Sequence, residues 1–333
     1  MKVLLIKTSS MGDVIHTLPA LTDAARAIPG IRFDWVVEEG FAEIPAWHPA
    51  VDQVIPVAIR RWRKNLWKTL RTGEWRQFKR RLREGQYDLV IDAQGLLKSA
   101  WLTRYCRAPI AGLDRDSARE PLASRFYDRT FHVAKEQHAL ERVRQLFAQA
   151  LGYAPPDSIG DYGLNRAALA EPSAAPYIVF LHGTTWASKH WPEADWRALA
   201  ERLSAEGWAI RLPWGSPAER ERAERIAIGL PGVEVLPRLN IVGVARVLAG
   251  ARACVAVDTG LGHLAAALDV PSISLYGPTR PGRVGAYGKG QVHLCATGPN
   301  AGGGDREKPC FEGLDAGRVH DELRRLLSAS AAG

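Results

Sequence analysis

The chain has few cysteines and no long apolar run, and each shortage excludes a class of protein. Its 333 residues include four scattered cysteines, none in a C-x-x-C pair. Neither a disulfide framework nor a zinc site is therefore expected, and a reducing, cytoplasmic location is favoured. Residues 172–188 are uncharged but contain two prolines and several polar residues. A membrane span needs about 20 mostly apolar residues, so none is predicted.

Several common sequence signatures are also missing. Gly288-Lys289 lacks the upstream glycine and the following Ser or Thr of a P-loop, and no H-E-x-x-H zinc motif is present. The N-terminal residues are typical of a core strand rather than of a signal peptide. Asp114 and Asp116 form a D-x-D pattern that could hold a divalent ion on a diphosphate. Such short acidic patterns are common by chance, so we predict no metal site and no cofactor.

Charge is distributed unevenly along the chain. The net charge is +8, yet residues 60–83 contain eleven lysines and arginines and one acid, Glu74, which leaves the rest of the chain at −2. Aromatic residues are interleaved with these cations, and Trp62, Leu66 and Leu70 fall on one face of a predicted helix. This composition suits an anionic membrane surface or an anionic glycolipid, with a solvated charged helix as the alternative. No nucleic-acid-binding motif accompanies it, so nucleic acid is not an expected partner.

Strand and helix patterns alternate in two blocks, with a segment rich in proline and glycine between them. The first block has predicted strands at residues 3–7, 32–37, 51–57 and 87–92, and helices at 14–27, 74–83 and 137–151. The second has strands at 177–181, 209–212, 233–236, 253–257 and 272–276, and helices at 193–206, 217–227, 241–249, 261–268 and 316–327. Short apolar strands separated by helices are typical of parallel α/β sheets.

The alternation therefore predicts two Rossmann-like domains. We expect an N-terminal domain over residues 1–155, a linker over 156–176 and a C-terminal domain over 177–333. The last helix either belongs to the second domain or returns to the first. Because interfaces between such domains are preferred ligand sites, we expect the two sheets to face each other across a cleft.

Asp13 follows the first strand after a turn of small residues that includes Gly12. Ligands of open α/β sheets bind outside the carboxyl ends of the strands, so this carboxylate is a candidate catalytic group. Asp is also a preferred residue at the start of a helix, and a helix cap is the alternative.

A candidate phosphate site follows the strand at residues 253–257. The sequence from Asp258 to Ala265 contains G-x-G-x-x-A and opens a helix, where free N–H groups and the helix dipole attract anions. A nicotinamide site would need an acid about 20 residues later, and residues 276–286 contain none. A nucleotide phosphate is thus favoured over a dehydrogenase cofactor, with tight packing around glycine as the structural alternative. His263 either contacts the ligand or caps the helix.

A second loop, residues 182–192, follows the strand at 177–181 and carries Thr184, Thr185 and Lys189. Hydroxyl groups and a lysine before a helix suit phosphate binding, and Lys189 would act as a point charge on a leaving diphosphate. A solvated lysine is the alternative.

Sequence stretches spread over most of the chain resemble one known family. They include KTSSMGDVIHTLPALTDA, IPVAIRRWRK, IDAQGLLKSA, LPWGSP and VDTGLGHLAAALD. Together they are similar to the ADP-heptose:lipopolysaccharide heptosyltransferases, glycosyltransferases of the GT-B fold, and to the heptosyltransferase I type among them.

The resemblance implies transfer of L-glycero-D-manno-heptose from ADP-heptose to a Kdo sugar of Kdo2-lipid A, with inversion and without a catalytic metal. It implies Asp13 as general base. It further implies a donor site of Thr184, Thr185, Lys189, Glu219, Asp258, Thr259, Gly260 and His263. The implied acceptor site comprises Arg60, Arg61, Arg63, Lys64 and Arg119.

The resemblance also implies a place in the cell and leaves alternatives. We expect a cytoplasmic protein held peripherally at the cytoplasmic face of the inner membrane, in contact with its anionic surface. A heptosyltransferase II type of enzyme is one alternative, and a non-catalytic protein that binds nucleotide sugar or glycolipid is another.

Overall fold

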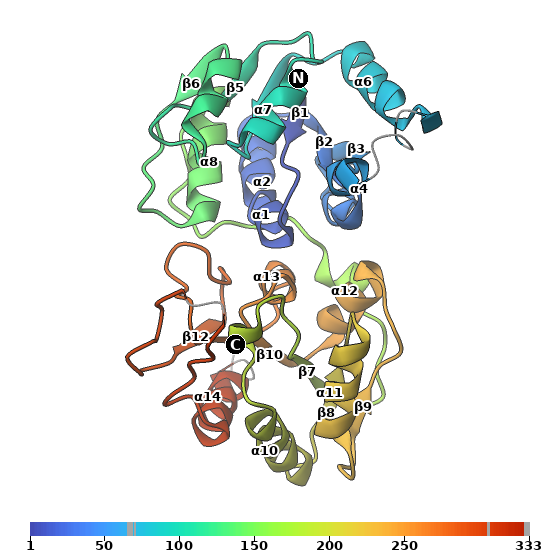
Figure 1. The fold of residues 1–333 in the computed structure, drawn as a ribbon, viewed down its shortest axis with the longest axis vertical. Helices are drawn as coiled ribbons and strands as arrows, with labels where there is room; N and C mark the ends of the chain where they lie inside the picture. Colours follow the sequence, from blue (N-terminus) through green and yellow to red (C-terminus); the bar gives the residue numbers. More distant parts are fainter. Residues whose placement is uncertain (65–68, 70, 305–306, 330–333) are drawn as a thin grey trace. The chain divides into compact units, whose positions relative to one another are not determined.

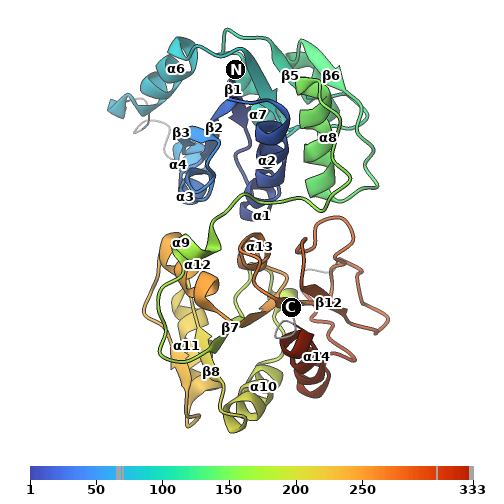
Figure 2. The same cartoon turned by 180° about the vertical axis from the view of Figure 1, so that it is seen from behind.

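The computed structural model describes residues 1–64, 69, 71–304 and 307–329. The chain divides into two compact units, Met1–Leu164 and Asn165–Gly333, so the division falls within the predicted linker. Each unit carries one six-stranded sheet in which every strand pair is parallel (Figures 1 and 2). The predicted α/β class with two Rossmann-like parts is therefore confirmed.

The first unit has the strand order β3-β2-β1-β4-β5-β6. Its strands are β1 (Lys2–Ile6), β2 (Arg32–Glu38), β3 (Val51–Val57), β4 (Leu89–Asp92), β5 (Ile110–Leu113) and β6 (Arg129–Phe131). Its helices are α1 (Met11–Ile15), α2 (Leu18–Ala27), α3 (Glu43–Ala46), α4 (Ile59–Lys64), α6 (Glu74–Glu84), α7 (Leu97–Thr103) and α8 (Ala139–Leu151), with short turns η1 (Glu39–Phe41) and η2 (Pro121–Phe126).

The second unit repeats this order, because its sheet reads β9-β8-β7-β10-β11-β12. Its strands are β7 (Tyr177–Leu181), β8 (Ala209–Leu212), β9 (Val233–Val235), β10 (Ala253–Val257), β11 (Ser272–Tyr276) and β12 (Gln291–Cys295). Its helices are α9 (Arg166–Leu169), α10 (Glu193–Ala205), α11 (Pro217–Ala227), α12 (Ile241–Gly250), α13 (Gly260–Ala267) and α14 (Ala316–Ala329), with the short turn η3 (Ala187–Lys189).

The structure corrects one expectation about the helices. The predicted helix over residues 14–27 is two helices, α1 and α2, because the backbone turns at Thr17 ahead of Pro19, which cannot donate to the preceding helical turn. The last helix, α14, packs within the second unit. Its Val319 and Leu323 are fully buried in the same apolar cluster as Trp196 of α10.

The first unit is further tied together by a buried ion pair. Arg144 of α8 donates from Nε to Asp23 Oδ2 of α2 at 2.6 Å, and both side chains are 3% exposed. The two helices lie side by side in Figures 1 and 2. Among the described residues, no helix is long and apolar enough to cross a membrane.

Candidate active site

Three of the predicted site residues lie at the point of each sheet where the strand order reverses. In an open parallel sheet, ligands bind outside the carboxyl ends of the strands where the strand order reverses. That point lies between β1 and β4 in the first unit and between β7 and β10 in the second. Asp13 follows β1, Lys189 follows β7, and Asp258 follows β10. Strand order thus brings these residues to the expected ligand-binding edges of the two sheets.

Asp13 has both a structural bond and an accessible oxygen. The prediction that it begins the helix was wrong, because α1 starts at Met11 with Ser10 as its cap. Asp13 Oδ2 accepts hydrogen bonds from Ser10 N at 2.6 Å and from Ser10 Oγ at 3.0 Å. The side chain is 32% exposed, and Oδ1 lies 3.9 Å from Lys7 Nζ. The cap therefore uses one carboxylate oxygen and orients the other.

Lys7 is a neighbour of Asp13 that sequence reasoning missed. Its Nζ donates to the carbonyl oxygen of Ala93 at 2.8 Å, and the side chain is 8% exposed. Burial lowers the pKa of Lys7, while the charges of Asp13 and Asp92 oppose that shift. The sequence shows a lysine at the end of the first strand. It does not show the contact of this lysine with Ala93, because that contact depends on the pairing of β1 with β4.

The turn before Asp13 is held by β4, which sequence reasoning also missed. Gln94 Oε1 accepts from the backbone N–H groups of Thr8 at 3.0 Å and Ser9 at 3.1 Å. Gln94 N donates in turn to Asp92 Oδ1 at 2.9 Å. Asp92 is fully buried, and burial raises its pKa despite these hydrogen bonds. The network fixes the backbone that carries the Asp13 carboxylate.

Four of the predicted acceptor-binding cations lie together on α4, and all are exposed: Arg60, Arg61, Arg63 and Lys64. Arg60 N donates to Glu38 Oε1 at 3.0 Å, and its guanidinium lies 5.8 Å from the ring centre of Phe41. The predicted face with Leu66 and Leu70, and the interleaved Trp67 and Lys68, lie outside the described residues.

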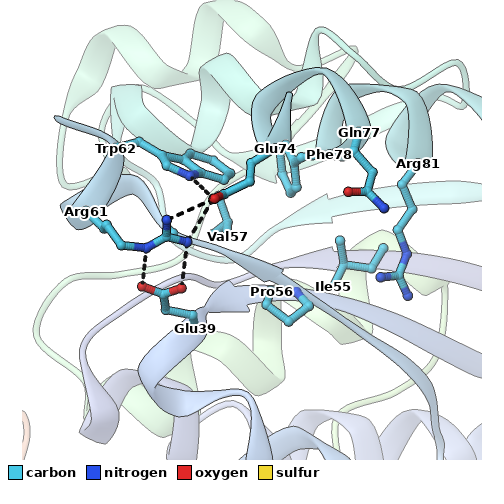
Figure 3. A pocket seen from close by; sticks show the side chains of 11 residues that line it. Glu39, Ile55, Pro56, Val57, Arg61, Trp62, Glu74, Gln77, Phe78 and Arg81 are labelled. Carbon is cyan, nitrogen blue, oxygen red and sulfur yellow. Dashed lines mark hydrogen bonds and ion pairs between the residues drawn. The ribbon is translucent and has the colours of Figure 1, made fainter. Parts of the chain in front are cut away.

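Arg61 differs from its neighbours because its guanidinium is already occupied. It donates to both oxygens of Glu39 at 3.1 and 3.0 Å and to Glu74 Oε1 at 3.2 Å (Figure 3). Glu74 also accepts from Trp62 Nε1 at 2.9 Å, and the hydrogen bonds from Arg61 and Trp62 lower the pKa of Glu74 to about 2. Arg61 therefore joins α4 to η1 and α6 as well as adding positive charge.

Arg119 lies apart from α4 in the sequence and is exposed in the loop before η2. Burial is the main cause that lowers the pKa of Lys7, and the charges of Arg142 and then Arg119 lower it further. Arg119 is thus within electrostatic reach of the end of β1. Strand order brings it there from a loop more than a hundred residues further along the chain.

In the second unit, Lys189 and Asp258 form a close ion pair. Lys189 Nζ lies 2.6 Å from Asp258 Oδ2, and the two side chains are 15% and 13% exposed. Thr279 Oγ1 donates to the same carboxylate oxygen at 2.8 Å. The ammonium also lies 4.2 Å from the ring centre of Trp186. These contacts place the Lys189 charge at the ends of β7 and β10.

The other predicted donor residues surround this pair. Thr184 Oγ1 donates to the carbonyl oxygen of Asp258 at 3.0 Å, while Thr185 is exposed. Helix α13 begins at Gly260 with Thr259 as its cap residue, and the side chain of Thr259 makes no capping bond. His263 is buried in the first turn of α13. The helix thus begins beside the Lys189–Asp258 pair.

Glu219 is held beside the loop that follows β7. Its Oε2 accepts from Gly215 N at 2.7 Å and from Ser216 N at 3.2 Å, which caps α11. A side chain on Gly183 would begin 2.6 Å from Glu219 Oε1, so glycine permits this approach. Glu219 therefore has a capping role and also borders the predicted donor loop.

His182 was not predicted as part of the site. It is fully buried at the end of β7, and burial together with the charge of Arg222 lowers its pKa to about 4. The imidazole is therefore neutral at pH 7. Its burial depends on packing against Trp196 of α10, which the local sequence does not reveal.

The predicted absence of a metal stays a prediction. Asp114 of the D-x-D pattern accepts from Ser117 N at 2.8 Å and lies 3.0 Å from His132 Nδ1. Within the part of the chain that the structure describes, no group of three or more His, Cys, Asp or Glu side chains is placed to hold a metal ion.

Comparisons with known proteins agree with this architecture. The family model described as glycosyltransferase family 9 (heptosyltransferase) matches residues 75–313. Lipopolysaccharide heptosyltransferase 1 of Pseudomonas aeruginosa is 70% identical over 329 residues, which cover 98% of this chain and 91% of that protein.

Solved structures give the same result. E. coli heptosyltransferase WaaC with ADP superposes with a TM-score of 0.92 at 54% identity, over 98% of this chain and 100% of that one. The same enzyme with ADP-2-deoxy-2-fluoro heptose superposes with a TM-score of 0.89 at 53% identity, over 98% and 99% of the two chains. This likeness confirms the predicted GT-B fold class.

The fold and these relatives define a glycosyltransferase. The chain belongs to glycosyltransferase family 9, the heptosyltransferases. The predicted resemblance to the heptosyltransferase I type of lipopolysaccharide biosynthesis is confirmed.

Proposed function

We propose that this enzyme transfers L-glycero-D-manno-heptose from ADP-heptose to a Kdo sugar of Kdo2-lipid A, with inversion at the anomeric carbon and without a catalytic metal. One observation carries the proposal. The ligand-binding edge of one sheet holds a carboxylate, Asp13, whereas that of the other holds a cation, Lys189, beside the start of α13. A single displacement requires both a base and a group that receives the leaving phosphate.

The second unit would bind the donor. The diphosphate of ADP-heptose would contact Lys189, the hydroxyls of Thr184 and Thr185, and the N–H groups at the start of α13 near Gly260. A helix N-terminus and a lysine both stabilise the negative charge that grows on departing ADP. Asp258 would orient Lys189, and Glu219 would contact the nucleotide sugar. The relatives' structures with ADP and with ADP-2-deoxy-2-fluoro heptose support a nucleotide sugar as the donor.

Asp13 would act as the general base. The acceptor hydroxyl oxygen forms a bond to the anomeric carbon from the face opposite ADP, and the bond from that carbon to the ADP oxygen breaks. The hydroxyl proton passes to Asp13 Oδ1, the oxygen not engaged by Ser10. A positioned base contributes about 100- to 10,000-fold to rate. Lys7 Nζ lies 3.9 Å from that oxygen.

The acceptor would be held by cations of the first unit. Arg60, Arg63 and Lys64 are exposed on α4, and the negatively charged carboxylates and phosphates of Kdo2-lipid A suit them. Arg119 would add a further positive charge, and Arg61 would fix the position of α4 through Glu39 and Glu74.

A second basic surface supports peripheral binding to the cytoplasmic face of the inner membrane. Exposed or partly exposed cations line a cavity of about 610 Å³ along α6: Arg76, Lys79, Arg80, Arg83 and Arg107. Near an anionic bilayer each such cation contributes about 1 kcal/mol. Sedimentation with vesicles, with and without anionic lipid, would test this part: binding should require anionic lipid and decrease with salt.

The proposed reaction can be tested by following ADP release from ADP-heptose with O-deacylated Kdo2-lipid A in the presence of EDTA. We expect release to require both substrates, and the new glycosidic bond to have inverted anomeric configuration by NMR. A heptosyltransferase II type of enzyme would be active only on an acceptor that already carries a heptose. A non-catalytic binding protein would release no ADP with either acceptor.

A further inference from the structure

The first unit contains a large apolar cavity that the proposed reaction leaves unused. Its volume is about 660 Å³, and it lies among α4, α6, α7 and η2. Most of its lining is aromatic or aliphatic: Trp62, Trp75, Leu97, Trp101, Leu102 and Phe126. Soluble proteins rarely leave an apolar surface of this kind open without a ligand or partner.

One wall of the cavity is a rigid aromatic stack. The rings of Trp75 and Trp101 are parallel within 2°, with centres 5.5 Å apart. Trp62 meets Trp75 edge-on at 5.4 Å. Trp101 is nevertheless 42% exposed and Leu97 39% exposed. The wall is therefore ordered by its own packing and still open to a ligand.

Cations border this apolar wall and connect it to Asp13. Arg63 and Lys98 also line the cavity, and Lys98 Nζ donates to Ser9 Oγ at 2.9 Å. Ser9 precedes Ser10, whose N–H donates to the Asp13 carboxylate. The cavity thus has a mostly apolar lining that includes two cations, and one of these cations is hydrogen-bonded to the turn that precedes the proposed base.

A second cavity beside the first is lined by charged residues of both signs. It measures about 550 Å³, and its lining includes Arg60, Arg61 and Lys64 as well as Glu38, Glu39 and Phe41. Glu39 is paired with Arg61, and Glu38 accepts from the backbone N–H of Arg60, whereas the side chains of Arg60 and Lys64 form no ion pair within the described part of the chain. Thr69 lines both cavities. An amphiphile with an anionic head and an apolar tail matches this pair of neighbouring sites, because each part of it meets a surface of suitable chemistry.

We propose that the apolar cavity binds an alkyl chain of the acceptor while the cations hold its anionic head and Asp13 meets its hydroxyl. Assigning the chain to the acceptor rests on the proposed function, whereas the site for an anionic amphiphile stands on the cavity and its charges. Burial of each further methylene should lower Kd about fourfold until the cavity is filled.

The direct test is calorimetric titration with octyl, decyl and dodecyl phosphate, each below its critical micelle concentration. Wild type should bind them with Kd falling as the chain lengthens. Leu97→Gln and Trp101→Ala should flatten this dependence. Leu122→Gln is the matched control, since Leu122 is a 53% exposed leucine near α7 that does not line the cavity. A Kd independent of chain length, or equal effects of Leu97→Gln and Leu122→Gln, would overturn the proposal.

Transfer kinetics then test whether the amphiphile that the cavity binds is the acceptor itself. With acylated acceptor, Leu97→Gln should raise KM about tenfold or more, whereas KM for the O-deacylated acceptor and its kcat should match wild type. The unchanged deacylated reaction also shows that the variant is folded. Chain-dependent binding without transfer to either acceptor would contradict the proposed function and leave the amphiphile site standing. If Leu97→Gln and Leu122→Gln reduce vesicle binding equally, the surface around these two leucines docks on a bilayer, and the cavity proposal fails.

Discussion

Lys189 Nζ lies 2.6 Å from Asp258 Oδ2, and this ion pair joins the loop after β7 to the end of β10. Thr279 donates to the same oxygen, so the carboxylate holds the ammonium in one place before any ligand arrives. A cation that is already positioned needs little reorganisation when negative charge develops on a leaving group.

Removing the Lys189 charge should therefore slow the chemical step. For Lys189→Ala we expect kcat to fall about 100- to 1000-fold, the loss typical when a charge-stabilising donor is removed. Steady-state ADP release at saturating acceptor measures this. Lys289→Ala removes an exposed lysine of the same unit and should leave kcat unchanged. A wild-type kcat for Lys189→Ala would remove it from the donor site.

Gln94 should affect rate by positioning Asp13. Its Oε1 accepts from Thr8 N and Ser9 N, so Gln94→Leu leaves both N–H groups unpaired and loosens the turn. We expect kcat to fall about 10- to 100-fold, as for a small misplacement of a reacting group, with KM for ADP-heptose unchanged. Gln94→Glu keeps the accepting oxygen and should recover most of the rate. Gln149→Leu is the control, and equal losses in both leucine variants would contradict the positioning role.

Lys64 and Arg61 should contribute differently to acceptor binding. Arg61 is held by Glu39 and Glu74, whereas Lys64 makes no ion pair among the described residues. Lys64→Ala should raise the acceptor KM about tenfold, the value of one charge-assisted hydrogen bond. Arg61→Ala should raise it less, and Arg238→Ala in the second unit should have no effect. The initial rate against acceptor concentration at fixed donor gives these values. A larger effect from Arg61→Ala would mean that the acceptor displaces its carboxylate partners.

The buried pair between Arg144 and Asp23 should dominate the stability of the first unit. Asp23→Ala removes one of the two carboxylates that face the buried guanidinium, since Glu141 stays 3.0 Å from it; the lost charge-assisted hydrogen bond should cost about 1.5–3 kcal/mol. Arg26→Ala breaks an exposed pair with Asp161 and should cost less than about 1 kcal/mol. Urea unfolding followed by tryptophan fluorescence compares the two. Equally small losses of unfolding free energy in the two variants would contradict a larger contribution from the buried pair.

Stability of the second unit should decrease in mild acid because of His182. Burial lowers its folded pKa to about 4, whereas the unfolded value is about 6.5. The unfolded chain therefore binds a proton first as pH falls, and stability is lost between about pH 6.5 and 4, by about 3 kcal/mol in total. His182→Leu should flatten that part of the pH profile in urea unfolding at pH 4.5 and 7. The same slope in both proteins would contradict this cause.

Short apolar strands could be predicted from the sequence where both faces are buried. All five strands predicted in the second unit occur, and β7, β8, β10 and β11 have the predicted bounds. Strands β7 and β10 are uninterrupted apolar runs, which are typical of buried parallel strands, whereas β8 and β11 alternate apolar residues with Arg211 or with serines. Strands β5, β6 and β12 were not predicted. Their sequences are short or carry polar residues, as in Gln291–Cys295, and only pairing with a neighbouring strand orders them.

The sequence predicted the place of Asp13, in the segment after β1, and of Asp258, directly after β10. The supporting contacts were not predictable, because Gln94 reaches Thr8 across 86 positions of sequence through the pairing of β1 with β4. Local sequence also could not show that Arg61 is occupied by Glu39 and Glu74, which come from two other elements.

The central claim is that Asp13 takes the acceptor proton, and Asp13→Asn compared with Ser10→Ala tests it most directly. Ser10→Ala removes a helix cap and should cost about 0.5–2 kcal/mol of stability. ADP release with O-deacylated acceptor and EDTA should be nearly wild type for Ser10→Ala. In folded Asp13→Asn it should fall at least about 100-fold, because the amide keeps the capping oxygen but cannot accept the proton. Undiminished turnover by Asp13→Asn would contradict the account and leave Asp13 as part of the helix cap alone.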